Sequence, residues 1–151
     1  MKVKFKYGIQ TYSGTIDEMV YGSYRDDKLC IGREYVYPTL NANNALLGTV
    51  GSNLRDLWLS ASQDYRDDFK LYAQRNASQN VPKTEWPPNS YALFIKAMYA
   101  WQDANPETVD LASVNDEDVD TLGATINTVK NCIDNGMLPA ISVYDDLTGV
   151  F

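Results

Sequence analysis

The stretch Lys28–Ala61, KLCIGREYVYPTLNANNALLGTVGSNLRDLWLSA, decides the fold because its hydrophobic period changes at Pro38. Before the proline, successive side chains alternate between two faces, which is typical of a β-strand. After it, apolar residues recur at spacings of three and four, as on an amphipathic helix. Proline cannot donate a hydrogen bond to a sheet, so Pro38 ends the strand. A sheet followed by helices is therefore predicted.

Two further segments upstream read as strands. Lys2–Tyr7 alternates lysines with apolar residues, and Thr15–Tyr24 is joined by the polar turn Arg25–Asp27 to the strand Lys28–Tyr37. These segments predict an antiparallel β-meander of three strands. The short apolar run Ala140–Tyr144 is a candidate fourth strand that returns to this sheet.

Four helices are predicted after Pro38. The first starts near Asn41–Asn44, and the second covers about Ser62–Arg75, with one continuous helix across residues 41–75 as the alternative. The third, Ser90–Gln102, is apolar almost all round, as in a buried central helix. The fourth runs from the cap Asn115 to Asn135-Gly136. Its apolar seam is Val119, Leu122, Ile126, Val129 and Ile133.

Apolar stripes on the first two helices define the predicted core. The stripe of the first helix consists of Leu47, Val50, Leu54, Leu57, Trp58 and Ala61. The inner stripe of the second helix consists of Tyr65, Phe69 and Tyr72. The whole is expected to be an α+β protein in one domain over residues 1–151, with a β-rich part (1–38), a helical part (41–136), and a short strand and tail (137–151).

Charge is divided unequally along the chain. Residues 1–101 carry 12 Lys/Arg against 10 Asp/Glu, or +2, whereas residues 102–151 carry Lys130 alone against 10 Asp/Glu, or −9, which gives −7 overall. This acidic balance disfavours nucleic-acid binding. Histidine is absent, so the usual catalytic triads and nitrogen-ligated metal sites cannot form. Neither a catalytic residue nor a cofactor is predicted.

Cys30 and Cys132 are far apart in sequence, and the sequence leaves open whether they pair, although two buried thiols are favoured. No run approaches the ~18 apolar residues of a membrane span. The N-terminus lacks the apolar region of a secretory signal. The expected location is the cytoplasm or a virion, with export by a route that the sequence does not reveal as the alternative.

Three groups of side chains are candidates for protein interaction: three lysines on the first strand, one tryptophan in a proline-rich loop, and three acids at the start of the last helix. They are Lys2, Lys4, Lys6, Trp86, Asp116, Glu117 and Asp118. The lysines also protect an exposed sheet edge, and the acids also suit a helix dipole. If the lysine face of one copy meets the acidic region of the next, the head-to-tail contact builds rings or filaments.

The run from Lys28 to Asn41 leads to Leu57-Trp58 and then to Tyr65-Arg-Asp-Asp-Phe69-Lys-Leu-Tyr-Ala73. Over about residues 28–75 this pattern resembles small phage, prophage and bacterial proteins of unassigned role. Those proteins have a β-hairpin, an arginine strand that ends in proline, and paired helices. The resemblance implies a structural or assembly association and transfers no catalytic residues.

The leading hypothesis is a non-enzymatic structural or protein-interaction protein, specifically a phage-like virion or filament assembly subunit. Its partner is then another protein or a second copy of the chain. The alternative is a small carbohydrate- or peptide-binding module that uses exposed Trp and Tyr side chains. The chain has 3 Trp and 11 Tyr in total. A third hypothesis is a hydrolase that relies on two carboxylates about 5–10 Å apart.

Overall fold

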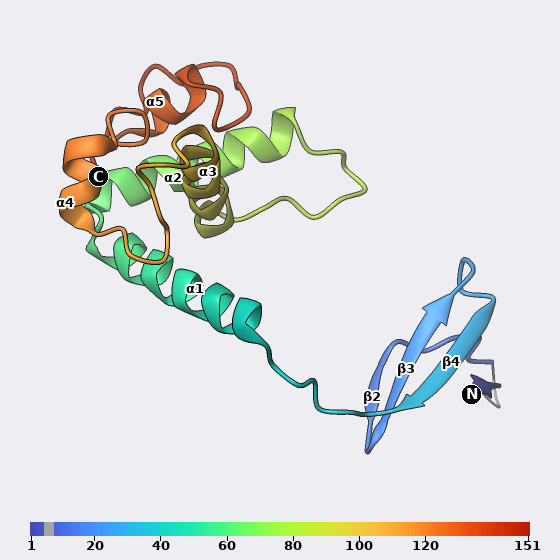
Figure 1. Ribbon diagram of the computed structural model, residues 1–151. Coiled ribbons are helices and arrows are strands. Elements are labelled where there is room, and N and C mark those ends of the chain that lie inside the picture. The colour runs from blue at the N-terminus through green and yellow to red at the C-terminus, as the bar shows by residue number, and fades with distance from the viewer. Residues whose placement is uncertain (5–7) are drawn as a thin grey trace. The chain divides into compact units, whose positions relative to one another are not determined.

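The computed structural model describes residues 1–4 and 8–151, and it divides into two compact units, Met1–Leu40 and Asn41–Phe151 (Figure 1). The first unit contains the strands and the second contains the helices, so the α+β class is confirmed. The boundary lies between the β-rich and helical parts that the sequence distinguishes.

The first unit is a four-stranded antiparallel sheet in the order β1-β4-β3-β2. Its strands are β1 (Lys2–Val3), β2 (Gly14–Ile16), β3 (Met19–Tyr24) and β4 (Leu29–Glu34). An antiparallel meander is present, but it consists of β2, β3 and β4, whereas the prediction made Lys2–Tyr7 its first strand. β1 instead lies at the edge beside β4, with Lys2 opposite Ile31. The lysine-bearing strand is therefore an edge strand.

The predicted strand Thr15–Tyr24 is wrong as a single element, because a tight turn folds it into β2 and β3. Asp17 in that turn has a φ of 52°, a left-handed conformation that aspartate tolerates better than most residues. The predicted turn at Arg25–Asp27 is present, and the Lys28 N–H donates to the Arg25 carbonyl across it. The third strand ends at Glu34 rather than Tyr37, and the end of the predicted first strand lies outside the described residues.

The second unit contains five helices among the residues described: α1 (Ala42–Ser60), α2 (Gln63–Gln79), α3 (Ser90–Ala104), α4 (Asp116–Leu122) and α5 (Val129–Asp134). Asn41 and Asn44 form a reciprocal capping box at the start of α1. Ala61 is extended, and the Ser62 side chain accepts from the Tyr65 N–H to begin α2. Two helices, not one, therefore occupy residues 41–75.

The predicted single last helix is wrong, because turns across residues 123–128 divide it into α4 and α5. At Gly123 the chain bends so tightly that a Cβ atom would lie 2.3 Å from the Val119 carbonyl oxygen, and only glycine fits. Thr128 then caps α5. Leu122 of the predicted seam is half exposed as a result. Asn135-Gly136 ends α5, as predicted, and Gly136 has a positive φ.

The core of the second unit is built around aromatic side chains of α2 and α3. Tyr65, Phe69 and Tyr72 are buried, as predicted, and Phe94 and Trp101 of α3 complete the group. The Tyr65 and Phe69 rings meet edge to face, with centroids 5.1 Å apart. Segments outside the helices also enter this core: Val109, Leu111, Val114, Leu138, Ile141 and Leu147.

The candidate fourth strand at Ala140–Tyr144 is wrong, because this part of the chain pairs with no strand. Residues 139–151, here called the C-terminal strap, instead follow α2 without regular structure. Side chains of α2 supply the hydrogen bonds that a neighbouring strand would otherwise supply. Ile141 of this apolar run is buried in the helical core instead of a sheet.

Both cysteines are free and buried. Burial raises the pKa of the Cys132 thiol to about 12, so this side chain behaves as a small apolar residue. Within the described residues, no helix is both long and apolar enough to cross a membrane.

Candidate functional site

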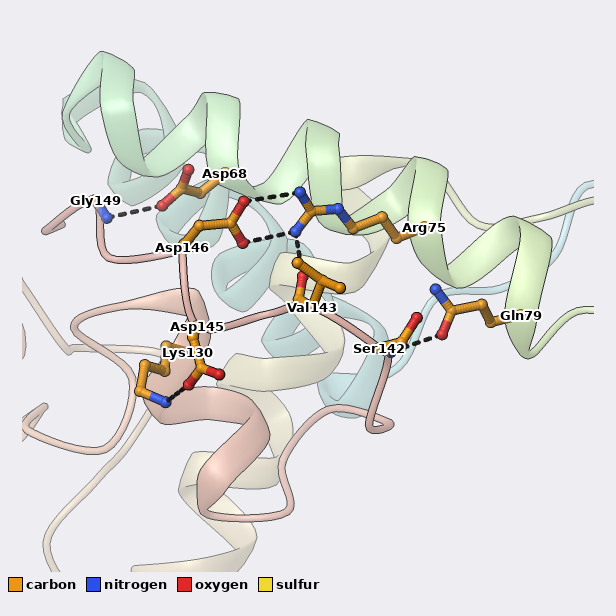
Figure 2. Close-up of polar contacts among 9 residues, drawn as sticks. All are labelled: Asp68, Arg75, Gln79, Lys130, Ser142, Val143, Asp145, Asp146 and Gly149. Atoms are coloured by element: carbon orange, nitrogen blue, oxygen red, sulfur yellow. Dashed lines mark hydrogen bonds and ion pairs between the residues drawn. The ribbon is translucent and has the colours of Figure 1, made fainter.

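Arg75 is the principal anchor of the C-terminal strap to α2 (Figure 2). Its guanidinium donates two hydrogen bonds to the carboxylate of Asp146, at 2.7 and 2.8 Å, and a third to the carbonyl of Val143. The hydrogen bonding of Arg75 to the Asp146 carboxylate is the main reason why the pKa of Asp146 lies below its usual value. A planar guanidinium matches a carboxylate in this way, so the contact fixes orientation as well as charge.

Two more α2 side chains hold the strap on either side of Arg75. The Gln79 carbonyl oxygen accepts from the Ser142 N–H at 2.7 Å, and the Asp68 carboxylate accepts from the Gly149 N–H at 2.7 Å. Residues at these spacings lie along one face of a helix, and Figure 2 shows the three side chains in a row above the strap. The strap is thus attached over about three helical turns.

Lys130 of α5 anchors the strap from the other side. Its ammonium group donates to the carboxylate of Asp145, contacts Asp134 at 3.4 Å, and lies 4.9 Å from the ring centroid of Tyr144. The hydrogen bond to Asp145 raises the pKa of Lys130. The backbone N–H of Lys130 also donates to the carbonyl of Leu147, whose side chain is buried in the core.

A shallow acidic hollow of about 670 Å³ lies between α2 and the strap. Its carboxylates are those of Asp64, Asp67, Asp68 and Asp146. Hydrogen bonds from Lys70 and Gln63 lower the pKa of Asp67, as Arg75 lowers that of Asp146. A glycosidase acid requires a raised pKa instead, so these two shifts favour ion pairing over proton donation. In the described part of the chain, no group of three or more His, Cys, Asp or Glu residues is placed to hold a metal ion.

The predicted lysines and acids belong to different units. Lys2 and Lys4 are exposed, and Lys6 lies outside the described residues. The acids at the start of α4 form contacts within the chain: Asp116 accepts from the Ser60 hydroxyl at 2.8 Å, and Asp118 completes a capping box with its helix cap. Glu117 is exposed. Two of the three acids therefore have a structural role.

The tryptophans are found in three different environments. Trp86 is 96% exposed in the loop between α2 and α3, whereas Trp101 is 1% exposed in the core. Trp58 is half buried, and its ring lies 5.1 Å from that of Phe94, centroid to centroid. Trp86 is therefore the most exposed of the three tryptophans.

The first unit buries little of its own apolar surface. Cys30, at 2% exposure, is the one hydrophobic side chain of the described residues 1–40 that is buried. Ile9, Ile16, Tyr24, Tyr35, Val36, Tyr37 and Leu40 are all exposed. A unit of about 40 residues whose described part buries so little apolar surface generally needs another surface for stability.

Sequence reasoning missed a second exposed apolar surface, on α1. The predicted stripe placed Leu47 in the core, but Leu47 is 61% exposed and Leu46 55%. Every residue from Asn41 to Thr49 is exposed, because this half of α1 extends past the helices that cover its other half (Figure 1). A sequence signal was available: residues 35–54 contain no charged residue, in a chain that is 22% charged.

Comparison of the chain with protein-family models, with curated proteins and with solved structures gives no match.

Proposed function

We propose that the protein is a non-enzymatic structural or protein-interaction protein, a self-associating assembly subunit of the phage-like kind. The observation that carries the proposal is that the described residues of the first unit bury one hydrophobic side chain, Cys30. A small unit that exposes this many large apolar side chains becomes stable when a second protein surface covers it.

The charge of the two units supports head-to-tail association. Residues 1–40 carry six Lys/Arg and five Asp/Glu, or +1, whereas residues 41–151 carry seven and fifteen, or −8. Six of the ten acids after residue 101 have hydrogen bonds or ion pairs within the chain. The carboxylates of the other four have none within the described residues: Asp103, Glu107, Glu117 and Asp120. These four carboxylates are available to the lysine-bearing edge of a neighbouring copy.

Hydrogen–deuterium exchange of the full chain at two protein concentrations tests the proposal. If another copy covers the first unit, the backbone amides of β3 and β4 exchange more slowly in the concentrated sample than in the dilute one. The amides of α2, which lie over the chain's own core, serve as the internal control and change little. Equal protection of β3 and β4 at both concentrations contradicts the proposal.

A second candidate function rests on the exposure of Trp86. Its loop is stiffened by three prolines, and the Glu85 N–H donates to the Pro82 carbonyl at 2.9 Å to close a turn. A rigid, exposed tryptophan is a suitable anchor for a peptide or a sugar ring. In a ligand titration followed by fluorescence, the response is expected to disappear in Trp86→Phe if this side chain is the anchor.

A further inference from the structure

The N-terminal half of α1 has an apolar face that nothing within its own unit covers. Leu47 continues the stripe of Val50, Leu54 and Leu57, which are buried against the core, but Leu47 itself lies one turn beyond the end of that core. Isolated helical turns are marginal in water and normally derive their stability from packing. The N-terminal half of α1 therefore has the apolar face of a helix that packs against another helix, but no helix of its own unit packs there.

Gly51 lies one turn after Leu47 on the same face. A Cβ atom built at this position meets nothing within 4 Å, so no neighbour in the described structure requires a glycine there. Glycine is nevertheless the least favourable helix residue apart from proline. A helix from outside the chain, approaching closely at this point, would account for it.

We propose that this face, formed by Leu47 and Gly51 and bordered by Leu46, binds the same face of a second copy in an antiparallel, two-fold pair. The inference rests on the proposed self-association and names one of its surfaces. In such a pair the Leu47 side chain of each copy packs into the space left by the missing side chain of Gly51 in the other copy.

Charge favours a second copy as the occupant. Residues 41–151 carry a net charge of −8. Two copies that contact each other through the charged surfaces of these residues therefore bring carboxylates together, and the copies repel each other. The first charged residue of α1 is Arg55, and the turns before it can meet their own copy without like-charge repulsion. The depletion of charge at this position is also typical of the centre of a protein interface.

The face is short, and this sets the conditions of the experiment. Eight helical residues extend about 12 Å, less than is needed for a standard interface of about 800 Å² per partner. The association is therefore sought by sedimentation equilibrium of the full chain at about 0.1–1 mM protein. About 1 M NaCl reduces the Debye length to about 3 Å and suppresses the head-to-tail contact between charged regions.

Leu47→Glu is the principal variant, because it places a carboxylate against its own copy near the two-fold axis. We expect its dimer dissociation constant to rise about tenfold or more. Leu59→Glu is the matched control: Leu59 is 60% exposed on a different side of the same helix, and the dissociation constant is expected to stay unchanged.

Gly51→Ala gives a second, independent readout. Alanine improves helix propensity, so the melting temperature of the dilute monomer is expected to rise by about 2–5 °C. The added methyl group fills the gap opposite Leu47, so the dissociation constant is expected to rise about fivefold or more. Thr49→Ala is the control, since Thr49 is exposed and lies on the opposite side of the helix from Leu47 and Gly51; it is expected to stabilise the monomer without weakening the dimer.

Three outcomes overturn the inference. If the wild type dimerises at high salt and Leu47→Glu dimerises equally well, the surface is wrong while the proposed self-association stands. If Leu47→Glu lowers the melting temperature of the dilute monomer, the chain's own residues 1–40 cover the face instead of a second copy. If the wild type is monomeric at every salt and protein concentration, the proposed function fails as well.

Discussion

Leu147→Ala tests whether the C-terminal strap is part of the helical core. Leu147 is 0% exposed although its segment has no regular structure, and its backbone carbonyl accepts from the Lys130 N–H at 3.0 Å. Truncation of a fully buried leucine costs about 2–5 kcal/mol, depending on how far the surroundings collapse. A strap without regular structure can shift into part of the cavity, so we expect the lower half of that range, about 2–3.5 kcal/mol.

Urea unfolding followed by tryptophan fluorescence measures this loss. The Trp86→Phe background removes the exposed reporter and leaves Trp58 and Trp101, which both contact the core of the second unit. With a slope of about 1.5–2 kcal/mol/M, the midpoint is expected to fall by about 1–2 M. Leu59→Ala, at an exposed position, is the matched control and should cost less than about 0.5 kcal/mol. A Leu147→Ala loss as small as that of the control refutes the account of the strap.

Three further predictions concern single groups of the second unit. Tyr65→Phe removes the buried hydroxyl that donates to the Ile126 carbonyl at 2.8 Å. The free energy of unfolding is expected to fall by about 1–1.5 kcal/mol in the same urea assay. An unchanged free energy indicates that this hydrogen bond is not formed. Val143 has a φ of 59°, which is strained for a β-branched residue, so Val143→Gly is expected to raise the free energy of unfolding by up to about 1 kcal/mol; a decrease contradicts the strained turn. Arg75 lowers the pKa of Asp146, so this pair contributes stability above the carboxyl's unfolded-state pKa of about 3.9 and loses it as the pH falls through the lower folded-state value. Urea midpoints are measured between about pH 2 and 7, and they are expected to fall less steeply on acidification in Asp146→Asn than in the wild type. If the midpoints of the two proteins fall equally steeply at acid pH, the pair has no such role.

Most of the helical arrangement could be predicted from the sequence, because local signals agree with burial. The spacing of Tyr65, Phe69 and Tyr72 gave the inner face of α2, and Asn41 and Asn115 gave two helix starts. Where the prediction failed, a local signal was weaker than a tertiary contact. The seam from Val119 to Ile133 remains apolar, but the bend at Gly123 allows Ile126 to reach the core from a turn.

The candidate site was less predictable. The contacts of Arg75 with the strap join residues about 70 positions apart, and no periodic pattern reports them. Leu47 has the spacing of a core residue, and periodicity cannot reveal that the core ends before that turn of α1 is reached. The uncharged run from Tyr35 to Leu54 was the one visible sign that this part of the chain differs from an ordinary solvated surface.

Light scattering is the most direct test of whether copies of this chain associate. The mass of the full-length chain is measured across protein concentration at low and at high salt. Self-association predicts masses above the 17.0 kDa of the monomer that rise with concentration. It also predicts larger species at low salt, where the oppositely charged regions attract, and at most the α1 pair at high salt. A mass of 17.0 kDa at every concentration and every salt contradicts it.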